Sequence, residues 1–239
     1  GTNFGFMNGC SARGTLDLPQ VTSYDYDALL DEEGNPTAKY LAVKKMMATH
    51  FPEYPQLEPL YKESMKVDAI PLAEKVSLFE TLDSLSSPIE SLYPQKMEEL
   101  GQSYGYLLYR TEASWDAEEE RLRIIDGRDR AQLFVDDQWI STQYQTEIGE
   151  DIFYQGEKKA LSRIDILIEN MGRVNYGHKF LADTQRKGIR TGVCKDLHFL
   201  LNWKQYPLPL DNPEKIDFSK GWTEGQPAFY AYDFTVQEP

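Results

Sequence analysis

Short apolar runs that alternate with polar residues dominate the chain from residue 104 onward. The clearest run is 164–169, in which Ile164, Ile166 and Ile168 share one face of a strand. Gly, Asp, Asn or charged clusters bound each run, as is typical of β-strands. Several short strands at near-regular spacing favour a β-sandwich or jelly roll over a βαβ fold. The strands predicted in this way cover residues 104–111, 122–125, 131–135, 139–143, 164–169 and 192–201.

Before these strands, the pattern predicts one amphipathic helix that begins at Asn35 and runs for about four turns. Asn caps the free N–H groups of a helix start, and the proline that follows loses no hydrogen bond there. Tyr40, Val43 and Met47 recur at helical spacing, and a second proline ends the helix just past Phe51.

Prolines recur among scattered apolar positions between residues 52 and 88. This pattern predicts an extended linker with short strands near 67–70 and 76–79. Near the end of the chain, residues 228–236 predict one more strand. Because a lone strand cannot bury its face or satisfy its edges, we expect the chain to be cut at this end.

The composition supports a buried core and argues against several partners. Of 239 residues, 41% are hydrophobic, and 25 Lys+Arg stand against 39 Asp+Glu, for a net charge of −14. Such an excess of acidic residues disfavours binding to nucleic acid and to anionic membrane surfaces, because such binding relies on clustered Lys and Arg. No stretch approaches the roughly 20 apolar residues that span a bilayer. Because the chain begins with Gly1 instead of Met, we expect it to be processed, trimmed or part of something longer.

Several kinds of site lack their sequence signature, and we predict neither a metal site nor a cofactor. The acidic cluster at 25–33 lacks the spacing of a calcium loop, and the three histidines show no ligand spacing. Gly-rich phosphate loops and a Gly-x-Ser-x-Gly elbow are missing as well. Cys10 and Cys194 are too few for a disulfide framework or a Cys-based zinc site. Two thiols and no glycosylation sequon favour a cytoplasmic or bacterial setting.

Two aromatic segments remain as candidates. Tyr24 and Tyr26 alternate with aspartates, so in extended backbone both rings face one way, as in a sugar-binding surface. The second segment is 169–177, a loop after the best strand that carries two Gly, two Asn, Arg173 and Tyr176. Its composition is equally compatible with a plain turn and with a binding edge. By contrast, 118–120 beside two arginines predicts an exposed acidic turn.

With these segments in place, the chain resembles glycoside hydrolase family 35, the β-galactosidases, and most closely their compact bacterial members. The resemblance covers almost the whole chain, in order. It is carried by Gly1-Thr2-Asn3-Phe4-Gly5, by Thr22-Ser23-Tyr24-Asp25-Tyr26-Asp27-Ala28 with Gly34-Asn35 and Lys39-Tyr40, by Ser103-Tyr104-Gly105-Tyr106 with Leu108-Tyr109-Arg110, by Glu169-Asn170-Met171-Gly172-Arg173-Val174-Asn175-Tyr176-Gly177, and by Pro227-Ala228-Phe229-Tyr230.

The resemblance implies a mainly β chain in which a galactose-binding-like jelly roll follows the last loop and helix of a (β/α)8 barrel. Residues 1–51 would end the catalytic barrel, 52–88 link it, 89–210 form the first jelly roll, and 211–239 start a second one. One departure from the family is the turn Asp136-Asp137, which lacks the expected Gly. We therefore expect a longer turn there.

The function implied is that of a retaining exo-β-galactosidase acting on terminal β-D-galactosyl residues of galactosides or glycans. Its catalytic glutamates would lie upstream of this chain, so no catalytic residue is assigned here. Glu169 in particular is not assigned as one, because Met171 and Gly172 replace the rest of the family's acid/base segment.

Tyr24 matches the tyrosine that reaches the galactose, and Tyr176 is our candidate for an aromatic on the aglycone side. We predict no cofactor and no metal, and the sequence leaves open whether the protein forms a homo-oligomer. The alternatives are a non-catalytic carbohydrate-binding module and a purely structural accessory domain.

Overall fold

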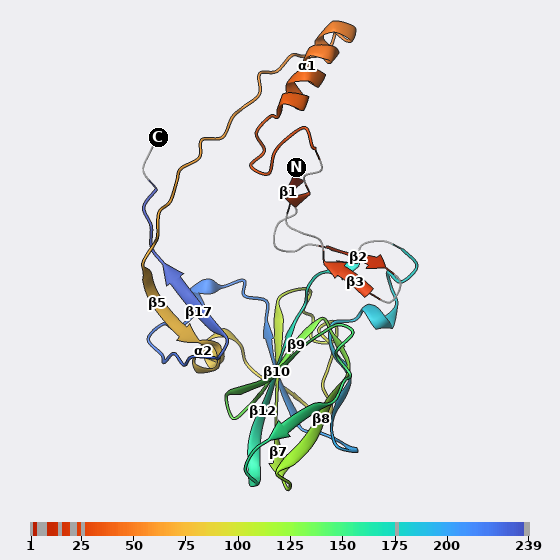
Figure 1. The fold of residues 1–239 in the computed structure, drawn as a ribbon, viewed down its shortest axis with the longest axis vertical. Helices are drawn as coiled ribbons and strands as arrows, with labels where there is room; N and C mark the ends of the chain where they lie inside the picture. Colours follow the sequence, from red (N-terminus) through yellow and green to blue (C-terminus); the bar gives the residue numbers. More distant parts are fainter. Residues whose placement is uncertain are drawn as a thin grey trace.

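Two antiparallel sheets pack face to face in the main body of the computed structural model, which describes residues 2–3, 9–13, 16–19, 23–24, 27–174 and 177–236 (Figure 1). Within these ranges the larger sheet has the order β10 (Gln138–Tyr144), β9 (Arg130–Val135), β12 (Lys159–Glu169), β7 (Tyr106–Trp115), β16 (Trp203–Leu208) and β6 (Ile89–Ser91). The smaller sheet has the order β11 (Ile152–Gln155), β8 (Glu119–Arg128), β14 (Gly188–Lys195) and β15 (His198–Phe199).

The predicted mainly β, sandwich-like fold is therefore confirmed, and each predicted strand range between 104 and 201 falls on an observed strand. The range 192–201 divides into β14 and β15, which pair with each other as a hairpin. The sequence pattern missed β6, β11 and β16, the last of which contains a proline.

The core between the two sheets is the physical reason for the alternation of apolar and polar residues along the strands. Ile164, Ile166 and Ile168 are all buried there, as predicted, against Ile124 and Val193 of the facing sheet. The largest fully buried side chains, Trp115, Trp203 and Tyr109, belong to the same cluster. A face buried by a second sheet places apolar residues at every other position of a strand.

The opposite face of the larger sheet is also covered. Helix α2 (Leu78–Leu85) and strand β17 (Ala228–Tyr232), which pairs with β5 (Leu72–Ser77), lie over it. Leu78 and Leu82 of α2 pack there in one cluster with side chains of the larger sheet. These sheet residues are Leu108, Phe134, Leu167, Tyr206 and Leu208.

Of two strands expected in the segment 52–88, one is confirmed only in part and the other is wrong. The strand expected at 76–79 is the end of β5 followed by the start of α2, because the apolar side chains there pack on the sheet as a helix. No strand forms at 67–70, where the described chain is extended without partners in a ladder. The expected strand at 228–236 exists as the shorter β17.

Helix α1 (Ala38–His50) confirms that a helix forms in the N-terminal part, but its cap differs and its apolar residues are spread around the helix instead of along one face. Thr37 is the N-cap, and its Oγ1 accepts from the Tyr40 N–H at 3.3 Å. The Asn35 side-chain oxygen instead accepts from the Lys62 N–H at 2.7 Å. No residue of α1 is buried against the described parts of the chain. No helix in the described residues is both long enough and apolar enough to cross a membrane.

Two smaller expectations are corrected by the geometry of acidic residues. The Asp136-Asp137 turn is tight, not long: Val135 pairs with Gln138, and the two aspartates adopt φ of +46° and +70°. Asp tolerates this left-handed region, which a two-residue hairpin requires at both positions.

Glu120 is buried in β8 and not in an exposed turn. Burial opposes its ionisation, but Lys195 and two backbone N–H groups outweigh it and lower the pKa of Glu120.

Candidate functional site

The loop between β12 and β13 (Arg173–Val174) is fastened to the segment that precedes β7. The Asn170 N–H donates to the Gly105 carbonyl at 3.1 Å, and Asn170 Nδ2 donates to the Ser103 carbonyl at 3.0 Å. In turn, the Asn170 side-chain oxygen accepts from the Gly172 N–H at 3.0 Å. These bonds define the start of the loop that leads to Asn175 and Tyr176.

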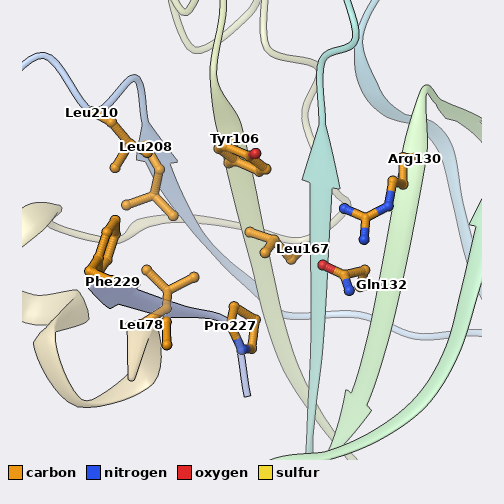
Figure 2. Close-up of a pocket in the computed structure, with 10 residues that line it drawn as sticks. Leu78, Tyr106, Arg130, Gln132, Leu167, Leu208, Leu210, Pro227 and Phe229 are labelled. Carbon is orange, nitrogen blue, oxygen red and sulfur yellow. The ribbon is translucent and has the colours of Figure 1, made fainter. Parts of the chain in front are cut away.

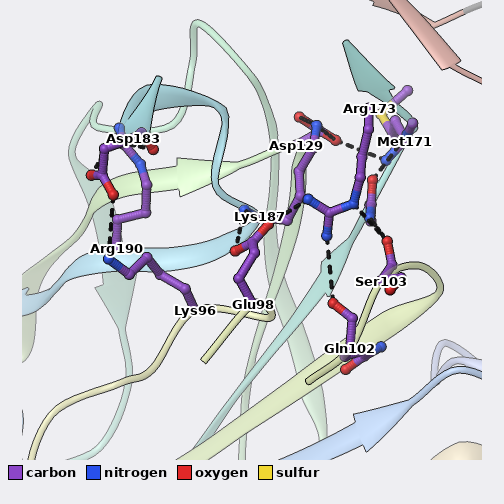
Figure 3. A network of polar contacts seen from close by, with 12 residues as sticks. Lys96, Glu98, Gln102, Ser103, Asp129, Met171, Arg173, Asp183, Lys187 and Arg190 are labelled. Carbon is purple, nitrogen blue, oxygen red and sulfur yellow. Dashed lines mark hydrogen bonds and ion pairs between the residues drawn. The ribbon is translucent and has the colours of Figure 1, made fainter. Parts of the chain in front are cut away.

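Arg173 adds a charged anchor in the same loop (Figure 3). Its Nε donates to the Ser103 carbonyl at 2.7 Å, and its Nη1 pairs with the Glu98 carboxylate. Glu98 also accepts from the backbone N–H of Lys187 at 3.1 and 3.2 Å. One carboxylate therefore joins the loop to the strand-entry segment before β14.

A fully buried ion pair lies behind the loop. Asp129, between β8 and β9, and Lys187 are each 0% exposed, and Lys187 Nζ donates to both Asp129 oxygens at 2.7 and 2.8 Å. Asp129 Oδ2 also accepts from the Met171 N–H at 2.8 Å (Figure 3). The charge of each group is thus matched, as burial of ions requires.

The same loop pairs with the N-terminal part of the chain. Strand β13 runs parallel to β2 (Gly9–Arg13), with Arg173 opposite Gly9 and Val174 opposite Cys10. The thiol of Cys10, which is buried, donates to the Met171 carbonyl at 3.4 Å. Strand β2 pairs in turn with β3 (Leu16–Pro19), and the small sheet lies against the end of the sandwich (Figure 1).

The structure describes only part of the predicted binding residues. Tyr24 lies in β4 (Ser23–Tyr24), where its backbone pairs with Thr2 of β1 (Thr2–Asn3). Tyr176 and Asn175 lie outside the described residues, between Val174 of β13 and Gly177. The roles suggested for both tyrosines remain predictions. What the structure adds is the set of anchors on the chain that leads to Tyr176.

A separate cavity of about 280 Å³ lies between the outer face of the larger sheet and the pair formed by α2 and β17 (Figure 2). Leu78, Leu208 and Phe229 form its apolar side, while Arg130 and Gln132 of β9 form its polar side. Its remaining lining residues are Tyr106, Leu167, Leu210, Pro227 and Ala228.

Glu169 takes a structural role beside this cavity. Arg130 Nη1 donates to Glu169 Oε2 at 2.9 Å, so the two charges compensate each other. Burial, reinforced by the nearby Glu169, raises the pKa of the Tyr106 hydroxyl. The Glu169 carboxylate is therefore engaged in an ion pair with Arg130 on the larger sheet. Among the described residues, no group of His, Cys, Asp or Glu is arranged to hold a metal ion.

Sequence comparisons decide the family. The profile of "Glycosyl hydrolases family 35" matches residues 1–50, and that of "Beta-galactosidase, first all-beta domain" matches residues 94–209, which contain most of the sandwich. This chain belongs to glycosyl hydrolase family 35.

Relatives named as β-galactosidases align over most of the chain. "Beta-galactosidase" of Xanthomonas manihotis is 36% identical over 100% of this chain and 39% of its own length. "Beta-galactosidase 1" of Dictyostelium discoideum is 34% identical over 89% of this chain and 35% of its own. "Beta-galactosidase" of Mus musculus is 36% identical over 87% and 32%. The chain thus spans less than two-fifths of the length of these relatives.

Sequence reasoning did not find the residues that anchor the loop between β12 and β13. Asp129, Lys187 and Glu98 are charged residues outside regular periodicity, a pattern that ordinarily indicates a solvated surface. The residues meet only because the ends of β8, β12 and β14 converge at one edge of the sandwich (Figure 3).

Proposed function

We propose that this chain forms the C-terminal part of a retaining exo-β-galactosidase, which releases terminal non-reducing β-D-galactosyl residues from galactosides or glycans. Its membership of family 35 and the names of its relatives support the proposal. The division into a barrel end (1–51), a linker (52–88), a first jelly roll (89–210) and the start of a second (211–239) is part of the same proposal.

The observation that carries the proposal is the parallel pairing of β13 with β2. Strand β2 lies in the segment that matches the family 35 profile, while β13 lies in the all-β segment. The pairing therefore joins the loop of Tyr176 to the part of the chain that carries Tyr24. Two segments that recognise one substrate need such a connection.

The reaction proposed requires two carboxyl groups. One protonates the glycosidic oxygen while the other, about 5 Å away, attacks the anomeric carbon, and water then hydrolyses the galactosyl–enzyme bond. In this proposal both carboxyl groups belong to parts of the enzyme other than this chain. Tyr24 contacts the galactose, and Tyr176 stacks on the group attached to it, since an aromatic face suits the apolar face of a sugar ring.

The full-length product of this gene is expected to hydrolyse nitrophenyl β-D-galactoside with retention of configuration. Because a retaining enzyme inverts the anomeric carbon twice, β-galactose is the product expected first, and proton NMR of the early reaction distinguishes it from the α anomer. The absence of turnover, or α-galactose as the first product, would contradict the proposed function.

In the same full-length product, Tyr176→Ala is expected to lower kcat/KM for lactose several-fold more than for nitrophenyl β-galactoside. Loss of an aromatic contact costs about 0.5–1.5 kcal/mol, which corresponds to roughly 2- to 12-fold in rate. Tyr176→Phe keeps the ring and serves as the matched control, with the wild-type ratio of the two substrates expected. Equal losses for both substrates in Tyr176→Ala would argue against an aglycone role.

A further inference from the structure

The buried pair Asp129–Lys187 has no part in the chemistry proposed above, yet both side chains are 0% exposed. A buried ion pair stabilises a fold little more than apolar side chains of similar volume, because desolvation offsets the attraction. What this pair supplies, and what apolar side chains lack, is a carboxylate that accepts the Met171 N–H at 2.8 Å.

We propose that Asp129, held by Lys187, is a positioning residue that fixes the backbone of the loop 170–174 and thereby sets the enzyme's preference for the group attached to galactose. The inference rests on the proposed function, since it assigns the effect to Tyr176 at the end of that loop. Asp129 touches no substrate in this account and acts only through the loop.

Asp129 suits this role because it is itself fixed on three sides. Its N–H donates to the Glu169 carbonyl at 3.0 Å, and its own carbonyl accepts from the Gln145 N–H at 2.7 Å. Lys187 holds both carboxylate oxygens. The oxygen that receives the Met171 N–H therefore has a defined position relative to the sandwich.

A second branch of the network holds the loop further along. Glu98 binds both the Arg173 side chain and the Lys187 N–H, so the Met171 and Arg173 anchors share one lysine (Figure 3). Beyond Arg173, the pairing of Val174 with Cys10 aligns the loop with β2. Tyr176 follows two residues later, at most about 7 Å of extended chain beyond Val174.

The test uses two double variants of the full-length enzyme that both remove the ion pair. Asp129→Asn with Lys187→Met keeps an amide oxygen for the Met171 N–H, whereas Asp129→Leu with Lys187→Met removes every acceptor at this site. The Leu variant is expected to lower the ratio of kcat/KM for lactose to that for nitrophenyl β-galactoside by about tenfold, the scale of one lost buried hydrogen bond. For the Asn variant the ratio should stay within about twofold of wild type.

Equal ratios in the Leu variant and wild type would overturn the inference, and so would an equal shift in both double variants, since the charge and not the hydrogen bond would then matter. Ratios are measured well below the melting temperature of each variant. If the Leu variant does not fold, Arg173→Met decides: it removes the second anchor while keeping an apolar stem, and an unchanged ratio overturns the inference. If the substrate ratio shifts in Tyr176→Ala but not in the Leu variant or Arg173→Met, only the inference is contradicted. If the ratio is unchanged in Tyr176→Ala, the aglycone role of Tyr176 itself is contradicted.

Discussion

Asp129→Ala alone is expected to lower the free energy of unfolding by about 3–5 kcal/mol, because it leaves the ammonium group of Lys187 buried without its carboxylate. Lys187 is 0% exposed, so water does not solvate the uncompensated charge unless the surrounding strands move apart. The same change removes the acceptor of the Met171 N–H and adds the cost of a second unsatisfied group.

Urea denaturation of the chain, followed by tryptophan fluorescence, measures this loss, since Trp115 and Trp203 lie in the sandwich core. Glu90→Ala is the matched control. It removes one partner of the Glu90–Lys204 pair, whose nearest atoms are 3.8 Å apart and whose side chains are 71% and 53% exposed. A loss between about 0 and 1 kcal/mol is expected there. Similar small losses in both variants would mean that Lys187 reaches solvent.

Replacing both partners, as in Asp129→Leu with Lys187→Met, should restore much of the stability that Asp129→Ala loses, because no buried charge remains. Stability and substrate preference are therefore expected to separate: the single variant unfolds easily, while the double variant folds and shows the altered substrate ratio. This separation distinguishes positioning of the loop from simple support of the fold.

The β-sandwich could be predicted from the sequence because alternation records burial directly. Ile164, Ile166 and Ile168 occupy one face, and that face meets the second sheet. Helix α2 could not be predicted in the same way. Its first residues form a short apolar run that is compatible with a strand as well as with a helix. The helix is stabilised by packing against the outer face of the larger sheet, which is distant in sequence.

The candidate site was predictable only in part. Tyr24 and Tyr176 came from resemblance to family 35 and not from local pattern, since a loop rich in Gly and Asn is also ordinary turn composition. The anchors Asp129 and Lys187 lie 58 positions apart, and a single sequence carries no signal that pairs one aspartate with one lysine among many. The burial of Glu120 could not be predicted for the same reason, because its partner Lys195 lies on a neighbouring strand that is distant in sequence.

Gly188→Ala is expected to destabilise the sandwich by about 2–5 kcal/mol, the sum of backbone strain and the displacement of a buried hydroxyl. Gly188 has φ of +90°, and a Cβ there would lie 2.2 Å from the Tyr109 hydroxyl oxygen. That hydroxyl donates to the Gln95 carbonyl at 2.7 Å and accepts from the Ile189 N–H at 3.0 Å. Burial raises the pKa of Tyr109, which favours the protonated hydroxyl that donates to the Gln95 carbonyl.

Gly225→Ala separates the two contributions, because Gly225 has φ of +83° but no atom within 4 Å of the added methyl group. It should show only the backbone cost of about 1–2 kcal/mol. Tyr109→Phe removes the hydroxyl and leaves space for the methyl group, so Gly188→Ala combined with Tyr109→Phe should lose less stability than the two single variants added together. Strictly additive losses in urea denaturation would show that the methyl group and the hydroxyl do not compete for one space. A non-additive cycle would instead place the clash between the methyl group at position 188, the residue that follows Lys187, and the Tyr109 hydroxyl.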